Sequence, residues 1–461
     1  MAVESTLDAE AASDAGASGA SRDERGDLGL NLADLIEMTS ANPIVGAALA
    51  DLDVHRARLG QAAWAPWSGF SASALFTAIP EQRGLSELLD GTLTRYAEDP
   101  QWSAAEWGPY VRLGLSGAIP IWTFGKLSSA REAAEAGVEA GRGGVERARH
   151  MVRSEVRRAY LSLLLSREIL LLISDGRGYI DEARDEIRAR IDRGEGGAAM
   201  IDIYKLDALT ADVDARELQA RRLEDVALAG LRMLAGVDAG VRVADVPLGP
   251  FSIERRGVAE YVEMAGRGRP DLRALRAAAE AQRAKLRLER ARYYPDLALG
   301  VTLGYAYSNV ADDQHNPWLS DPYNYATYGA ALLLDCPLDF GMDYWRVDEA
   351  EAALRRVEEQ VEVLSRAVEA EVSDAYAAIV ETQARTRAYD AGRTAAKRWL
   401  IAVLQGMTLG LHEAGDLTDA LIAYFSNEAN YLSAVWDLDV AWVRLAFTTG
   451  GDFLDGLEPR E

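Results

Sequence analysis

Four stretches of the chain alternate between apolar residues and polar or small ones, and they come in two pairs. The alternation is clearest from Leu297 to Tyr307, where every second residue is apolar. Period two is the pattern of a strand with one apolar face. A polar loop separates the two strands of each pair, and in the first pair we expect it over 80–107. The pattern predicts four strands, at about 66–79, 109–120, 295–309 and 324–337.

Each predicted strand has one apolar face, while Ser, Thr, Gly and a few charged residues make up the other. The apolar positions in chain order are Phe70, Ala72, Ala74, Phe76; Val111, Leu113, Leu115, Ile119; Leu297, Leu299, Val301, Leu303, Tyr305, Tyr307; and Ala326, Tyr328, Ala330, Leu332, Leu334. Four such strands cannot close a membrane barrel, since the smallest closed ones have about eight strands. Two copies of the chain would supply about eight strands and three copies about twelve.

Helical periodicity dominates the rest of the chain. Lys126 to Asp192 contains no proline, and its apolar residues recur at spacings of three and four. A helix of this length is typical of a coiled-coil wall. We predict two long helical hairpins, at about 126–235 and 342–449. The helices alone would also fit an ordinary antiparallel coiled coil, and the strands favour the membrane barrel.

Landmarks recur in the same order in the two halves of the chain. Gly196 precedes Asp202 by the same number of residues as Gly410 precedes Asp416. A proline followed a few residues later by Phe-Gly leads into each long helix, at Pro120 to Gly125 and at Pro337 to Gly341. Ordered matches of this kind predict an internal duplication. The resulting segments are a disordered acidic spacer (1–27), a first repeat (28–240), a linker (241–256), a second repeat (257–450) and a C-terminal tail (451–461).

The ordered motifs resemble the TolC family of outer-membrane channel-tunnels over about Leu28 to Gly450. They are Arg269-Pro270-Asp271-Leu272, Tyr294-Pro295-Asp296-Leu297, Pro337 to Gly341, and Asp416-Leu417-Thr418-Asp419-Ala420. The resemblance implies an α+β membrane protein: a homotrimer whose twelve-stranded β-barrel, with four strands per chain, is continued in the periplasm by a long α-helical barrel. It also implies three kinds of contact, namely a periplasmic adaptor protein, an inner-membrane pump and outer-membrane lipid.

Charge and composition narrow the possible partners. The 461 residues carry 49 Lys and Arg against 73 Asp and Glu, a net charge of −24. That charge disfavours nucleic acid and anionic lipid surfaces as partners. The single cysteine, Cys336, excludes an internal disulfide. No apolar run of about 18 residues predicts a membrane-spanning helix. Residues 1–27 lack the apolar core of a signal peptide, so we expect the true start of an outer-membrane protein to lie upstream.

No catalytic constellation is apparent. The four histidines are scattered without metal-ligand spacing, and no nucleotide-binding loop or nucleophilic triad is present. We therefore expect no enzymatic activity, no cofactor and no bound metal.

The acidic pair Asp416 and Asp419 is the strongest candidate site. The two residues lie three apart at the start of a predicted helix, so both occupy one face. Aspartates in such positions also cap helices and complement the helix dipole. By the resemblance, they form an acidic ring at the periplasmic entrance of the trimer. Asp202 is the equivalent in the first repeat, with a bracing or capping role.

The predicted hairpin ends supply the remaining candidates. Where some TolC relatives carry a tyrosine and an arginine that brace the closed entrance, this chain has Met407 and His412. The resemblance assigns adaptor contacts to six residues at the two ends, namely Arg193, Gly194, Gly196, Leu409, Gly410 and Leu411. The favoured function is an outer-membrane exit duct for efflux or type I secretion, and a soluble coiled-coil scaffold is the alternative. The sequence leaves the cargo open, with a slight preference for small molecules.

Overall fold

The computed structural model describes residues 29–83, 87–89, 93–95, 101–194, 200–236, 243–244, 246–313, 320–408, 411–412, 414–451 and 453–454. The predicted spacer at 1–27 and most of the predicted tail lie outside the described residues. Two compact units emerge, and both halves of the chain contribute to each. One takes the described parts of Met1–Asp51, Arg142–Ala274 and Glu362–Glu461, and the other takes those of Leu52–Gly141 and Leu275–Val361.

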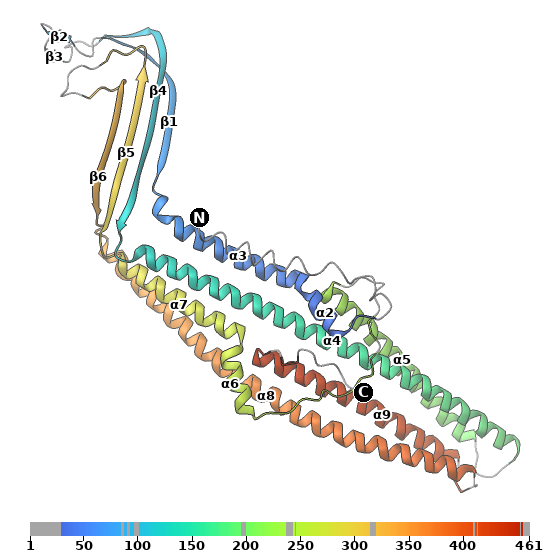
Figure 1. Ribbon diagram of the computed structural model, residues 1–461. Coiled ribbons are helices and arrows are strands. Elements are labelled where there is room, and N and C mark those ends of the chain that lie inside the picture. Colours follow the sequence, from blue (N-terminus) through green and yellow to red (C-terminus); the bar gives the residue numbers. More distant parts are fainter. Residues whose placement is uncertain are drawn as a thin grey trace. The chain divides into compact units, whose positions relative to one another are not determined.

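The sheet of the second unit contains the four predicted strands. They are β1 (Ser71–Arg83), β4 (Gln101–Trp122), β5 (Asp296–Ser308) and β6 (Tyr325–Asp335), which lie side by side in the order β1-β4-β5-β6 and are antiparallel throughout (Figure 1). A separate small hairpin joins β2 (Glu87–Leu89) to β3 (Leu93–Arg95). β4 and β5 pair across the two halves of the chain.

Three of the expected strand limits differ from the structure by several residues. β1 starts at Ser71, because the short 3₁₀ helix η2 (Ala65–Trp67) takes up the residues around Pro66. The expected loop over 80–107 is wrong in part, because β1 continues to Arg83 and β4 begins at Gln101. Their pairing resumes after a register shift at Pro80. Proline cannot donate to the ladder, and a bulge accommodates it.

The register places all four apolar faces on the same side of the sheet. Ala72 lies opposite Leu115, Leu115 opposite Leu303, and Leu303 opposite Tyr328. Many of these side chains are exposed within one chain, and Phe76 at 72%, Tyr328 at 86% and Leu334 at 71% are the extremes. The predicted apolar faces are therefore confirmed as one continuous apolar surface.

The other side of the sheet is mostly small and polar, and Leu75, Ile79 and Leu333 are its larger apolar residues. Ser71 lies opposite Ser116, with their hydroxyl oxygens 3.1 Å apart. Ser116 in turn lies opposite Thr302, and Thr302 opposite Gly329. One side of this sheet therefore favours an apolar environment, and the other side favours a polar one. The outer strands β1 and β6 each have one strand neighbour within the described residues, so each leaves one edge open.

An ion pair and a ring stack join the sheet to its helices. Lys126, the first residue of α4 (Lys126–Asp192), places Nζ 2.9 Å from a carboxylate oxygen of Asp296 and donates to the Tyr294 carbonyl at 2.9 Å. The ring of Phe124 stacks on Tyr294 with centroids 5.2 Å apart. Phe124 and Gly125 have φ of 49° and 91°, so the chain turns here through the left-handed region, which glycine tolerates best.

The remaining helices follow a common plan in the two halves. The first half has α2 (Leu32–Met38), η1 (Thr39–Ala41), α3 (Pro43–Trp64), α4 and α5 (Met200–Ala235). The second half has α6 (Val258–Gly268), α7 (Pro270–Ala291), α8 (Phe340–Thr408) and α9 (Ala414–Thr449). α3 and α7 each have 22 residues, and α5 and α9 each have 36. The predicted hairpins correspond to α4–α5 and α8–α9. No described helix carries an apolar stretch that could cross a bilayer.

The core of the first unit is formed where the long helices meet. Its largest fully buried side chains include Trp442, Tyr160, Leu231 and Ile379, which come from α9, α4, α5 and α8. Apolar residues at spacings of three and four give each helix one buried stripe. Burial of these stripes is the main favourable contribution to this unit.

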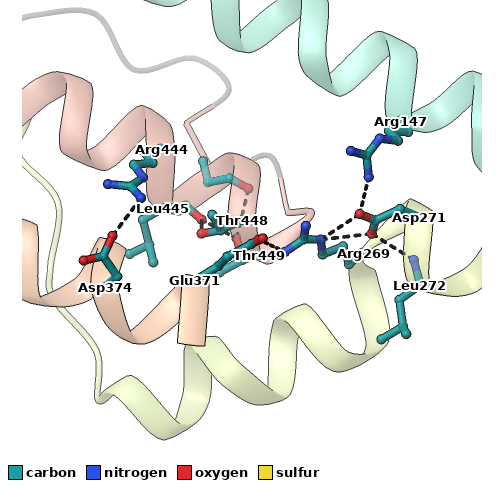
Figure 2. A network of polar contacts seen from close by, with 11 residues as sticks. Arg147, Arg269, Asp271, Leu272, Glu371, Asp374, Arg444, Leu445, Thr448 and Thr449 are labelled. Carbon is teal, nitrogen blue, oxygen red and sulfur yellow. Dashed lines mark hydrogen bonds and ion pairs between the residues drawn. The ribbon is translucent and has the colours of Figure 1, made fainter. Parts of the chain in front are cut away.

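A polar network surrounds Arg269, which lies between α6 and α7 (Figure 2). Its guanidinium is buried and pairs with Glu371 of α8, and Nε donates to both carboxylate oxygens of Asp271 at 2.9 and 3.1 Å. Arg147 of α4 also pairs with Asp271. The backbone of Gly450 packs so closely on Arg269 that a Cβ there would lie 2.7 Å from the arginine Cα. The Arg269-Pro270-Asp271-Leu272 motif therefore joins α4, α7, α8 and the end of α9.

The described part of the linker contacts the helices through one buried carboxyl group. Asp439 of α9 is fully buried, and its Oδ1 accepts a 2.9 Å hydrogen bond from the backbone N–H of Phe251. Its Oδ2 is buried without a hydrogen-bond partner among the described atoms. Burial raises the pKa of Asp439 to about 8, and the Phe251 hydrogen bond opposes that rise.

Candidate functional site at the helical hairpin ends

Both long hairpins reverse direction at glycine-containing ends. α4 stops at Asp192, and Gly194 follows with φ of 65° while its N–H donates to the Ile191 carbonyl at 3.0 Å. This is the common glycine-ended helix terminus. At the other hairpin, the Leu411 N–H donates to the Gly406 carbonyl at 2.9 Å. The two ends belong to the same compact unit.

The first turns of α5 and α9 lie against each other. Asp202 and Lys205 of α5 face Gly415 of α9, where an added Cβ would lie 3.5 Å from Asp202 Oδ1 and 3.6 Å from Lys205 Nζ. Lys205 Nζ also lies 3.6 Å from Asp202 Oδ1. Asp202 is buried, so it lies in the contact between the two hairpins. This position agrees with the predicted bracing role but does not test it.

A small apolar core holds the two ends together. Leu206 of α5, Leu417 and Leu421 of α9, Ile187 of α4 and Val403 of α8 are all buried in it. Leu417, Thr418 and Ala420 are buried, whereas the neighbouring Asp416 and Asp419 are exposed. The helical period thus orients the acidic pair outward while the neighbouring residues pack. The structure confirms that both aspartates share one exposed side of α9.

His412 adds a contact that the sequence left open. Its Nδ1 lies 3.2 Å from Oδ2 of Asp416. Its ring also rests on Gly406, where a Cβ would lie 2.2 Å from the His412 Cδ2 atom. Only glycine at position 406 leaves room for this ring position. His412 therefore packs against the end of α8 and contacts the start of α9.

The remaining predicted site residues divide into two groups. Arg193 is described, and its guanidinium lies 3.6 Å from the carboxylate of Glu186, about two helical turns earlier in the chain. Leu411 is exposed. Three of the predicted adaptor contacts, Gly196, Leu409 and Gly410, lie outside the described residues, and the Met407 side chain does as well.

The arrangement offers charge and shape rather than covalent chemistry. Within the described residues, no three histidine, cysteine or acidic side chains come together as metal ligands would. What the ends present is an exposed carboxylate pair beside a histidine, over a rigid apolar core. Sequence reasoning missed Lys205 as the neighbour of Asp202. Its i, i+3 spacing on α5 was the available signal.

Known proteins resemble this chain in both sequence and fold. Residues 262–451 match the outer membrane efflux protein family. The alkaline protease secretion protein AprF of Pseudomonas aeruginosa is 27% identical over 305 residues, which cover 63% of this chain and 60% of AprF. The chain thus aligns with less than two thirds of that relative's length.

Two solved structures show how far the fold is shared. The outer membrane channel MtrE of Neisseria gonorrhoeae, in its open state, superposes with a TM-score of 0.73 at 19% identity and covers 94% of each chain. The outer membrane protein VceC of Vibrio cholerae superposes with a TM-score of 0.71 at 20% identity, over 92% of this chain and 96% of VceC. The family match therefore covers the second half of the chain, and the two structures show that the fold is shared over nearly the whole of it.

Proposed function

We propose that this protein is a passive exit duct in the outer membrane, with its long helices in the periplasm. The sheet is the observation that carries the proposal. It has a continuous apolar side, a Ser/Thr/Gly side and two open edges. Lipid favours the apolar side, and a water-filled lumen suits the other. A soluble scaffold would have no use for such a sheet.

Open strand edges point to assembly. In lipid every unpaired backbone group costs several kcal/mol, so the edges of β1 and β6 must pair with other copies. Three copies would close a barrel of about twelve strands, consistent with the trimer expected for the family. The shared plan of α3 with α7 and of α5 with α9 supports the two proposed repeats at 28–240 and 257–450.

The long helices also carry exposed faces suited to self-assembly. On α5 a stripe of alanines and larger apolar residues faces outward, and we call it the α5 seam: Tyr204, Ala208, Ala211, Ala215, Leu218, Val226, Ala229 and Met233. α8 has a second stripe, the α8 seam, which contains the exposed alanines Ala370, Ala377, Ala384, Ala388, Ala391, Ala395 and Ala402. Repeats of seven residues let helices pack as a coiled coil, and small side chains let them approach closely. We infer that the α5 seam of one copy packs against the α8 seam of the next.

At the hairpin ends, Asp416 and Asp419 form the narrow acidic entrance in this proposal. Three copies would contribute a ring of six carboxylates, which attracts multivalent cations. His412 packs beside the ring, Asp202 braces it, and Met407 belongs to the same turn. Exposed residues at both ends, Arg193 and Leu411 among them, would contact an adaptor that joins the duct to an inner-membrane pump.

The residues that support a duct do not identify the class of its cargo. The relative AprF is named for the secretion of an alkaline protease. That name supports protein secretion more than our slight initial preference for small molecules. We propose no enzymatic activity, because transport through such a duct needs none from its wall.

Conductance in a planar lipid bilayer tests the proposal. The purified protein should form cation-preferring pores that a trivalent cation blocks from one side. Changing Asp416→Ala together with Asp419→Ala should abolish that block, because the cation then loses the carboxylates that bind it. Folding should change little, since two exposed helix-start aspartates contribute about 1 kcal/mol each.

A matched control separates the local site from overall charge. Asp175→Ala with Glu369→Ala removes two exposed carboxylates from α4 and α8, away from the hairpin ends. This variant should be blocked like the parent. Equal block of the Asp416/Asp419 variant would place the constriction elsewhere. A parent protein that forms no pores would refute the duct.

A further inference from the structure

A groove opens between α5 and α9, with α4 as its floor. Its volume is about 380 Å³, within the range of small-molecule sites in proteins. All three walls belong to one compact unit. The apolar lining consists of Ile169, Leu172, Ile173, Ile180, Leu209, Val213, Leu223, Ile422 and Phe425.

The side chains at the bottom of the groove are closely packed. Ile173, Ile180 and Ala220 are buried. Gly176 lies beneath the ring of Phe425, and a Cβ there would be 3.3 Å from the ring. An apolar molecule of matching width would bury its surface against these side chains, at roughly 25 cal/mol per Å² removed from water.

Polar groups gather at the rim instead. Asp212, Arg216, Gln219, Arg222 and Asn430 line it. Arg216 Nε lies 2.8 Å from Asp212 Oδ2, so these two charges offset each other. Across the part of the chain that the structure describes, no hydrogen bond or ion pair engages the guanidinium of Arg222. The rim therefore carries one uncompensated positive charge on a protein with a net charge of −24.

The groove is separate from the α5 seam. Seam residues such as Ala208, Ala215 and Leu218 face outward, whereas Leu209, Val213 and Ala220 face the groove. At 3.6 residues per turn the two sets occupy different sides of α5. Arg222 stands at the seam position between Leu218 and Val226 and its side chain reaches the groove rim, so a copy packed on the seam would lie beside it while the apolar floor stays uncovered.

We propose that this groove binds a single-chain anionic amphiphile. The apolar chain lies along the floor between α5 and α9. Its anionic head lies at the rim, where Arg222 supplies the charge and the amides of Gln219 and Asn430 donate hydrogen bonds. Binding here does not depend on transport, so a failed conductance experiment would leave the groove proposal standing.

Photoaffinity labelling locates the site directly. The probe is dodecanoate with a diazirine in its chain, applied to the full-length protein in lipid nanodiscs. Peptides covering 209–223 and 422–433 should be labelled in a saturable way. Dodecanol with the same diazirine should need about tenfold more probe for equal labelling, because it cannot pair with Arg222.

Two variants with matched controls make the outcome decisive. Ala429→Phe puts a ring into the groove and should abolish the labelling, whereas Ser174→Phe, on the exposed side of α4, should not. Arg222→Gln should weaken labelling by dodecanoate about tenfold, and Arg398→Gln on α8 should not. Labelling of the strands alone, or labelling unchanged by Ala429→Phe, would overturn the site. Equal labelling by dodecanol and dodecanoate would overturn the role of Arg222.

Discussion

Replacing the buried carboxyl of Asp439 by an amide should change how stability depends on pH. In Asp439→Asn the side-chain oxygen can still accept the 2.9 Å hydrogen bond from Phe251. The amide never ionises, whereas Asp439 does so with a pKa that burial raises to about 8. The substitution therefore removes one titration and keeps the shape and the hydrogen bond.

The sign follows from the proton balance. Between about pH 4 and pH 8 the unfolded chain has lost this proton and the folded chain still holds it, so rising pH favours unfolding. Each pH unit in that window costs about 1.4 kcal/mol of folding free energy. Over the whole shift the loss is on the order of 5 kcal/mol, and it levels off above about pH 8.

Apparent melting temperatures of parent and variant, read from the helical circular dichroism signal between pH 4 and pH 9, test this. The two proteins should melt together near pH 4, and the variant should become steadily more stable as the pH rises. Protection of the Phe251 amide, relative to its intrinsic exchange rate at each pH, should fall with rising pH in the parent alone. Asp175→Asn, an exposed carboxyl on α4, controls for the loss of charge. A difference between Asp439→Asn and the parent that stays constant across the pH range would refute the reasoning.

Three further predictions follow from the fold. Leu299→Arg should make insertion into lipid less favourable by about 2–4 kcal/mol if this residue lies near the bilayer midplane. Thr302→Arg, on the other side of the sheet, should be tolerated, and equal damage from both changes would contradict the assignment of faces. Arg269→Met should lower the free energy of unfolding in urea by about 3–5 kcal/mol, because Asp271 and Glu371 lose their buried partner. Arg267→Met changes an exposed arginine nearby and should leave the free energy of unfolding almost unchanged. Ala215→Glu on the α5 seam should dissociate the proposed trimer in detergent while each chain keeps its helical content. An unchanged mass by light scattering would show that the seam is not an interface.

Alternation along the chain was sufficient to predict the strands and their faces. Leu115 and Leu303 lie in different halves, yet period two placed both on the apolar side, and the observed register pairs them directly. The long helices were equally predictable, since Lys126 to Asp192 offers no proline or strand pattern to interrupt them. Such features depend on local spacing, which a single sequence displays in full.

Contacts between distant segments were not predictable in this way. Asp439 looks like an ordinary helix residue, and its raised pKa arises only when Phe251 and the surrounding helices cover it. The position of the His412 ring likewise depends on the lack of a side chain at Gly406, which the sequence around His412 does not reveal. The strand extension beyond Pro80 was hidden because proline normally ends a strand, and a bulge overrides that rule. The entrance role of Asp416 and Asp419 stays a prediction that conductance will test.

The pairing of β4 with β5 has a consequence for how the protein is made. Tyr110 pairs with Ser308, so the middle of the sheet cannot form until most of the chain has been synthesised. Contacts between such distant residues slow folding, and apolar strands that wait for partners aggregate. β1 and β4 can pair as soon as the first half has been made, but the second edge of β4 and the apolar side of both strands stay uncovered until β5 and β6 follow. A cell that makes this protein must therefore keep the exposed edge and apolar side of the first pair of strands from aggregating until the second half arrives.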